Sequence, residues 1–172
     1  QGEDVEESGL VWGVADADCW TYPIPGSLTL QSWRSTPTGQ VQVSMHPVKG
    51  APAAAGDPRH VLARCIDRLK ADGFHPVMAV ELEFYLLDKN RDANGRPQPA
   101  RQTNGVRPQA PQVYGVYELE QLQPFLDDLY SACEAQGLPV RTAISEYAPG
   151  QVELTLEHRF DALQAVDEGV RY

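Results

Sequence analysis

The chain has few cysteines, no long apolar run and no cluster of basic residues. Its 3 cysteines are widely separated and form no C-x-x-C pair, which argues against a disulfide framework and favours a reducing, cytoplasmic compartment. No apolar stretch of about 18 residues and no signal-peptide pattern occurs, so we expect no membrane association. Lys and Arg are scattered and the net charge is −10 at pH 7, so nucleic acid is not an expected partner.

A glycine-rich phosphate loop is also missing, so no local motif predicts a nucleotide site. The 4 histidines show no metal-ligand spacing. With 172 residues, of which 42% are hydrophobic, the chain can form one domain, or one and a fraction, around a real core. It begins with Gln1 rather than Met and ends at Tyr172 inside a helical pattern, so we expect it to be a piece of a longer polypeptide.

Apolar residues at helical spacing predict three helices, between Asp57 and Gly73, from about residue 122 to 136, and from near Asp161 onward. Asp57 followed by Pro58 is typical of an N-cap and first helical position, and glycine is a typical stop. Pro124 is expected in the first turn of the second helix, where it does not kink it. Cys65 and Cys133 lie on the apolar faces of the first two helices, so we expect both thiols to be buried.

Short apolar or aromatic runs between Pro and Gly residues predict strands near the N-terminus, in residues 10–14, 19–22, 27–33 and 40–45. The full order of elements, β–β–β–β–α–β–α–β–β–α, indicates the α+β class with a largely antiparallel sheet. Residues 89–112 are rich in Pro, Gly, Asn and Gln and are long for an internal loop, so we expect this segment to be functional or disordered.

A pair of glutamates on one predicted strand is the first chemical signal in the chain. Glu81 and Glu83 alternate with the apolar residues Leu82 and Phe84, so both carboxylates are predicted to share one face while the apolar side chains are nearly buried on the other. Like charges at that spacing repel, and a nearby cation relieves the repulsion. Carboxylate oxygens suit Mg²⁺ or Mn²⁺ rather than zinc. Alone, such a pair is more often a solvated strand face.

A second acidic pair changes the balance between a metal site and a solvated strand face. Glu146 ends an apolar stretch, a turn containing Pro149 and Gly150 follows, and Glu153 lies at the start of another strand with alternating polarity. Four carboxylates on neighbouring β-segments favour a polynuclear metal site over a solvated surface. Tyr147 and Gln151, inside the same segment, are candidates for shaping a substrate pocket, although packing explains them equally well.

The two acidic segments, V-E-L-E-F-Y-L and S-E-Y-A-P-G-Q-V-E, resemble the E-x-E-F and E-x-x-P/A-G-Q-x-E motifs of the glutamine synthetase family. The exact sequence of the two segments is most similar to the branch that includes γ-glutamylpolyamine (γ-glutamylputrescine) synthetases. The resemblance extends over nearly the whole chain, which is less than half of a typical member. It implies an α+β fold with a partial β-grasp domain in residues 1–48, a linker in 49–56 and the start of an antiparallel-sheet catalytic domain in 57–172.

The resemblance also implies a site and an assembly. Glu81 would bind the metal nearer the nucleotide phosphates, and Glu83, Glu146 and Glu153 would bind the metal nearer the substrates. Asp4 occupies the place of an Asp that reaches the amine site of the neighbouring subunit, but Val-Glu-Glu replaces the family's Gly-Ser-Ser after it. A solvated acidic tail is the alternative for Asp4. Family members form homo-oligomeric rings, commonly of twelve subunits, with sites between neighbours.

The implied reaction is the ATP-dependent joining of the glutamate γ-carboxylate to ammonia or a polyamine through a γ-glutamyl phosphate, with Mg²⁺ or Mn²⁺ as cofactor. Divalent ions suit this chemistry because both the nucleophile and the phosphoryl donor are anionic. We expect the 172-residue piece to be inactive alone, because the remaining ligands lie beyond it. One alternative is a non-catalytic homologue that acts as an amine-binding or regulatory scaffold. Another is an acidic cation-binding module unrelated to ligases, which leaves the two-motif arrangement unexplained.

Overall fold

A computed structural model describes residues 18–110 and 112–172, which divide into two compact units. The first unit contains the described residues up to Thr29 together with Gly39–Pro76, and the second contains Leu30–Thr38 together with Val77–Tyr172. Within the described residues, no helix is long and apolar enough to cross a membrane. The predicted strand at residues 10–14 lies outside the described part of the chain. The expected domain boundary at residues 49–56 stays a prediction.

The first unit combines short strands with one helix. Strand β1 (Trp20–Pro23) pairs antiparallel with β4 (Val43–His46). Two shorter strands, β2 (Thr29–Leu30) and β3 (Gly39–Gln40), form a separate two-stranded sheet. The linker that follows leads into helix α1 (Pro58–Ala71), and Gly73 beyond its end has a φ of +82°, as a helix stop requires. The predicted helix and the strand near residues 19–22 are therefore present, and the strand predicted in 27–33 is reduced to β2. The single strand predicted in 40–45 is wrong, because β3 and β4 pair in different sheets.

Asp57 connects helix α1 to strand β4. Its Oδ1 accepts a hydrogen bond of 3.0 Å from the His60 backbone N–H, as an N-cap does, and its Oδ2 accepts one of 2.9 Å from the Met45 N–H. The prediction for Cys65 on this helix is wrong, because its side chain is exposed. Ile66 is the buried residue of α1, and the next position along a helix points about 100° away from it.

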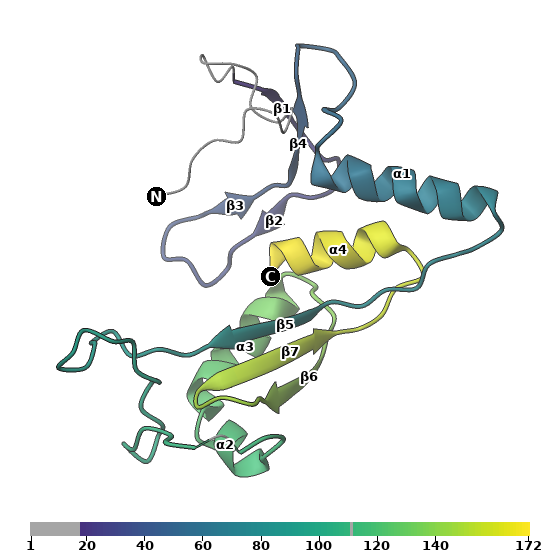
Figure 1. The fold of residues 1–172 in the computed structure, drawn as a ribbon. Helices are drawn as coiled ribbons and strands as arrows, with labels where there is room; N and C mark the ends of the chain where they lie inside the picture. The colour runs from purple at the N-terminus through teal and green to yellow at the C-terminus, as the bar shows by residue number, and fades with distance from the viewer. Residues whose placement is uncertain (1–17, 111) are drawn as a thin grey trace. The chain divides into compact units, whose positions relative to one another are not determined.

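The second unit contains a three-stranded antiparallel sheet in the order β5-β7-β6. Its strands are β5 (Glu81–Tyr85), β6 (Val140–Ser145) and β7 (Gln151–Leu156). Helix α3 (Gln123–Ala135) lies across one face, and α4 (Ala162–Arg171) follows β7 (Figure 1). The α+β class and the antiparallel sheet are thereby confirmed. A short helix, α2 (Val116–Glu120), was not predicted.

The local signals for the later helices are confirmed. Pro124 lies in the first turn of α3, and Gly137 beyond its end has a φ of +64°. Asp161 caps α4 by accepting hydrogen bonds from the backbone N–H groups of Leu163 and Gln164. These features depend on neighbours in the sequence, which is why the sequence pattern located them.

The core of the second unit is centred on β7. Val152 and Leu154 have no exposed surface and Leu156 is 2% exposed. Cys133 of α3 is buried against Leu154, as predicted for this thiol. The apolar side of the sheet therefore faces α3, which leaves the opposite side for the polar residues of the same strands.

Leu82 and Phe84 were expected to be nearly buried, but both are only half-buried. The faces were assigned correctly, because the exposure alternates along β5 with Glu81 and Glu83 on the more exposed side. Burial is incomplete because β5 is an edge strand of the described sheet, where β7 alone pairs with it. Phe84 still packs on the core, with its ring centroid 5.9 Å from that of Phe125.

The segment 89–112 is structured throughout its described residues. Leu87 forms a β-bridge with Pro99, and the Asp88 N–H donates to the Gln98 carbonyl at 3.0 Å. Arg107 forms an ion pair of 2.7 Å with Asp88, and both side chains are largely buried. These contacts argue against the disordered alternative for the described residues of this segment, and its functional role stays a prediction.

A pair of leucine truncations should show the difference between the central and edge strands. Leu154→Ala removes a fully buried side chain and should lower the free energy of unfolding by about 2–5 kcal/mol. Leu82→Ala on β5 should cost clearly less, because part of that side chain is already in contact with water. Urea unfolding of the two variants measures the difference, and equal losses would contradict the edge position of β5.

The Asp57 cap should make stability depend on pH. Burial raises the pKa of Asp57, but hydrogen bonds from Met45 and His60 outweigh it and hold the pKa below its ordinary value of 3.8. A carboxylate with a lowered folded-state pKa stabilises the fold above its unfolded pKa. This stabilisation should therefore be lost as the pH falls through about 3.8 and below.

Two substitutions separate the cap from its charge. Asp57→Ala should cost about 0.5–2 kcal/mol at neutral pH, because the helix loses its N-cap. Asp57→Asn keeps a capping oxygen and should lose only the acid-dependent component. Unfolding followed from pH 7 to pH 3 measures both, and an unchanged acid slope in Asp57→Asn would refute the assignment.

Candidate active site

Three of the predicted glutamates meet on the side of the sheet opposite the core. Glu83 on β5 is directly opposite Glu153 on β7 in the antiparallel register. Glu146 follows the last residue of β6, and its N–H donates to the Gln151 carbonyl at 3.0 Å. Residues opposite each other in antiparallel strands point to the same face. The two acidic motifs, more than 60 residues apart in sequence, are thus joined by the pairing of β5 with β7.

The pKa of Glu146 is raised above its ordinary value. Only 8% of its surface is exposed, and this burial is the largest cause that raises its pKa above the ordinary carboxylate value. The negative charges of Glu153 and Glu83 raise the pKa further, because like charges disfavour ionisation. A hydrogen bond from the Tyr147 N–H acts in the opposite direction. The pKa of Glu146 therefore depends on the charges of both neighbouring carboxylates.

The remaining predicted site residues lie apart from this group or outside the description. Glu81 is exposed and is opposite Thr155, two residues along β5 from Glu83. Asp4 lies outside the described residues.

Gln151 is next to the acidic group, since its Nε2 donates a hydrogen bond of 2.7 Å to Glu83 Oε2. Gln151 therefore contacts the acidic group, and its role in a substrate pocket stays a prediction.

The turn between β6 and β7 fits closely against the segment after β5. Gly150 has a φ of +78°, and its carbonyl accepts a 2.9 Å hydrogen bond from the Leu86 N–H. A Cβ at Gly150 would lie 3.2 Å from the Leu86 carbonyl oxygen and 3.2 Å from Pro99 Cβ. Glycine is needed there both for the backbone conformation and for this approach.

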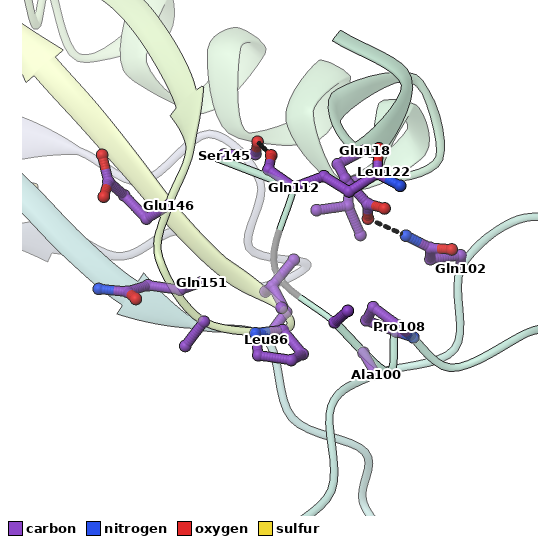
Figure 2. Close-up of a pocket in the computed structure, with 14 residues that line it drawn as sticks. Leu86, Ala100, Gln102, Pro108, Gln112, Glu118, Leu122, Ser145, Glu146 and Gln151 are labelled. Atoms are coloured by element: carbon purple, nitrogen blue, oxygen red, sulfur yellow. Dashed lines mark hydrogen bonds between the residues drawn. The ribbon is translucent and has the colours of Figure 1, made fainter. Parts of the chain in front are cut away.

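A small pocket lies between this turn and the ordered loop. Its volume of about 20 Å³ is enough for roughly one water molecule. In Figure 2, Glu146 and Gln151 point to one side of it, while Gln102 and Glu118 form a hydrogen-bonded pair on the other. The pocket is therefore a closely packed contact beside the acidic group, in which Glu83 is exposed while Glu146 and Glu153 are buried.

Tyr114 is the site residue that sequence reasoning missed. A hydrogen bond and the neighbouring charge of Tyr147, followed by the charge of Glu146, raise the pKa of its phenol. The ring centroids of Tyr114 and Tyr147 are 6.3 Å apart, in an edge-on arrangement. Its backbone N–H donates to the Ser145 carbonyl at 2.9 Å, which brings it beside Glu146. Tyr114 and Ser145 are about 30 positions apart in the sequence, so no local sequence pattern predicts this contact.

The donor chemistry of the acidic face fits a hard divalent cation. Carboxylate oxygens are the ligands that Mg²⁺ and Mn²⁺ prefer. A cation would relieve the repulsion by Glu153 and Glu83, which adds to burial in raising the pKa of Glu146. In the part of the chain that the structure describes, however, no three His, Cys, Asp or Glu side chains are close enough to enclose an ion. The assignment of metals to the four glutamates therefore stays a prediction.

Comparison with known proteins identifies the family. Residues 55–172 match the model of the glutamine synthetase catalytic domain. The chain belongs to the glutamine synthetase family. This match contains both acidic motifs and all of β5, β6 and β7.

Among curated proteins, the chain is 39% identical over 171 residues to the γ-glutamylputrescine synthetase PuuA of Escherichia coli. The alignment covers 98% of this chain and 36% of that protein. It is 32% identical over 115 residues to type-1 glutamine synthetase 1 of Dictyostelium discoideum, covering 66% of this chain and 22% of that protein. The chain thus spans about a third or less of the length of these relatives.

Solved structures of the family agree with the fold. A GmaS/ADP complex aligns with a TM-score of 0.70 and 26% identity, covering 92% of this chain and 34% of the other. Apo GmaS without ligand aligns with a TM-score of 0.72 and 25% identity, covering 94% and 36%. The α+β arrangement of this chain is therefore the arrangement found in the corresponding third of these glutamine synthetase homologues.

Gly150→Ala should show how tightly the second motif is held. Alanine at a positive φ costs about 1–3 kcal/mol, and here the new methyl also meets the Leu86 carbonyl. Gly95→Ala is a matched control, because Gly95 has a φ of +77° and no atom within 4 Å of a built Cβ. Gly150→Ala should therefore destabilise the chain more than Gly95→Ala in urea unfolding. Equal losses would mean that backbone conformation alone requires the glycine.

Proposed function

We propose that the protein containing this chain is an ATP-dependent ligase that joins the γ-carboxylate of glutamate to an amine, ammonia or a polyamine, through a γ-glutamyl phosphate. The family match over the catalytic domain supports the reaction class, and the similarity to a γ-glutamylputrescine synthetase supports a polyamine as the amine. The observation that carries the proposal is the grouping of Glu83, Glu146 and Glu153 on one side of the sheet.

The four motif glutamates would hold two divalent cations, Mg²⁺ or Mn²⁺. We assign Glu81 to the ion beside the nucleotide and Glu83, Glu146 and Glu153 to the ion beside the glutamate and amine. When bound, such ions neutralise the charge that builds up when a phosphoryl group moves to a carboxylate. The chain's own contribution is to fix the carboxylates on paired strands, and Gln151 orients Glu83 through its hydrogen bond.

The amine must lose a proton before it attacks an acyl phosphate. We assign this role to a carboxylate on the acidic face, which would lie beside the bound amine. His158, the histidine closest in sequence to Glu153, instead packs its ring beside Phe160 at 6.5 Å. The same face would therefore bind the cations and receive the proton of the amine.

We further propose that residues 1–48 are part of a β-grasp domain, 49–56 a linker and 57–172 the start of the catalytic domain. The whole protein would form a cytoplasmic homo-oligomeric ring, in which Asp4 of one subunit reaches the amine site of its neighbour. In that assembly, the rest of the protein and the neighbouring subunit would complete the site on the acidic face.

Charge-removing substitutions in the full-length protein test this function. With ATP, glutamate and each of ammonia, putrescine and spermidine, Glu83→Gln and Glu153→Gln should lower phosphate release by about 100-fold or more, because a metal ligand is lost. Glu134→Gln, on the exposed side of α3, is a matched control and should retain wild-type activity. The isolated 172-residue chain should be inactive with every amine.

Two results would overturn the proposal. Wild-type activity in both Glu83→Gln and Glu153→Gln would show that these carboxylates hold no essential metal. A full-length protein that assembles but consumes no ATP with any amine would favour a non-catalytic homologue that binds amines or acts as a scaffold. Light scattering on the same samples reports the assembly.

A further inference from the structure

We propose that Arg159 and Glu168 are positioning residues for the acidic face. Their ion pair holds the segment before β5 against the segment after β7, and this attachment keeps Glu83 opposite Glu153. The inference rests on the proposed function, because it concerns how the same carboxylates are held for a divalent cation. It goes beyond that function by assigning a role to two residues that lie outside both acidic motifs.

Strand β5 depends on such an attachment because it is paired on one side only. Among the strands that the structure describes, β7 alone pairs with it. Its apolar residues Leu82 and Phe84 are only half-buried, so burial fixes the register of β5 less firmly than that of β7. The position of Glu83 relative to Glu153 therefore depends on how the ends of β5 are attached.

The segment before β5 continues the antiparallel pairing with the segment after β7. The Met78 N–H donates to the Arg159 carbonyl at 3.0 Å, and the Arg159 N–H donates to the Met78 carbonyl at 2.7 Å. The Leu156 N–H donates to the Val80 carbonyl at 3.0 Å. The backbone of Arg159 is thus paired with the chain just ahead of the strand that carries the first acidic motif.

The side chain of Arg159 connects this pairing to helix α4. Its Nε and Nη2 atoms donate to the two carboxylate oxygens of Glu168 at 2.9 and 3.0 Å, in the two-pronged geometry that guanidinium and carboxylate groups favour. The Glu168 side chain is 5% exposed and also accepts a 2.8 Å hydrogen bond from Gln164, one turn earlier. Removing the partner of such a buried carboxylate is costly, so the pair is a firm attachment.

Helix α4 also packs directly on the segment before β5. A Cβ built at Gly169, the residue after Glu168, would lie 3.0 Å from each of the two Cγ atoms of Val80. Glycine is unfavourable inside a helix, and this close approach explains its presence in α4. Because Glu81 follows Val80 directly, α4 contacts the chain one residue before the first site carboxylate.

Cation binding distinguishes positioning from simple stabilisation. Loosening the start of β5 displaces Glu83 relative to Glu153, so a cation that needs carboxylates from both strands binds more weakly even while the protein stays folded. An ion pair that only stabilises the fold would change the free energy of unfolding and leave cation binding by the folded protein as it is.

Hydrogen exchange and Mn²⁺ titration of the full-length protein test the inference. In the metal-free protein, Glu168→Gln should speed amide exchange in residues 78–85 about 10-fold, because the charge and one hydrogen bond of the pair are lost. The Kd for Mn²⁺ should rise about 10-fold in the same variant. Arg159→Lys keeps the charge but loses the two-pronged geometry, so both values should be intermediate. If Glu168→Gln does not assemble, Arg159→Lys decides by the same two measurements.

Two control variants should change neither measurement. Glu157→Gln removes one carboxylate charge just after β7, where Glu157 forms an exposed ion pair of 3.5 Å with Arg141. Asp57→Ala lowers stability in the other compact unit, so it reports what a loss of stability alone does to cation binding.

The outcomes separate this inference from the proposed function. If the Kd for Mn²⁺ rises in Glu168→Gln but the wild-type protein consumes no ATP with any amine, the positioning role stands and the ligase function fails. If the wild-type protein is an active ligase and Glu168→Gln keeps the wild-type exchange and Kd, the function stands and the inference is wrong. An equal rise of Kd in Asp57→Ala would also overturn the inference.

Discussion

The pairing of β7 with strands on both sides is the constraint on which the rest of the second unit depends. On one face of β7, Val152 and Leu154 are fully buried, which fixes the register of the strand because a shift of one residue would turn them outward. The same register directs Glu153 to the other face, opposite Glu83. The hydrophobic core thus positions the acidic group, although no apolar side chain touches a substrate.

This arrangement concentrates like charges, and that has an energetic cost. The raised pKa of Glu146 shows that its charged form is disfavoured by burial and by Glu153 and Glu83. Such a concentration of charge is tolerated because the buried residues of β7 stabilise the fold independently. Perturbed carboxylates in an open site are typical of functional groups rather than of structural ones. The electrostatics therefore mark this face as the candidate site, and it lies within the residues 55–172 that match the family model.

The sequence predicted the features that depend on near neighbours. Alternation placed Glu81 and Glu83 on one face of β5, and short-range caps located α1 and α4 at Asp57 and Asp161. It overestimated the burial of Leu82 and Phe84, because the depth of burial is set by which strands flank β5, and a repeat of two residues carries no such information. The prediction that Cys65 is buried was wrong for a related reason. The helical pattern indicates which face of the helix is apolar, but not how much of that face other residues cover. The two motifs were joined by resemblance, and the β5–β7 register supplies the physical link.

Tyr114 illustrates what lies beyond the reach of local patterns. It is separated from Ser145 by about 30 residues, and only the hydrogen bonds at the end of β6 bring its ring to Tyr147 and the acidic group. A buried Ser145 that satisfies the backbone of another segment is therefore part of the site's construction, even though it faces away from the glutamates. The carboxylates come from the strands and the aromatic surface from the segments between them. The strand register therefore fixes Glu83 and Glu153, whereas the position of Tyr114 depends on the hydrogen bonds that its segment forms with Ser145.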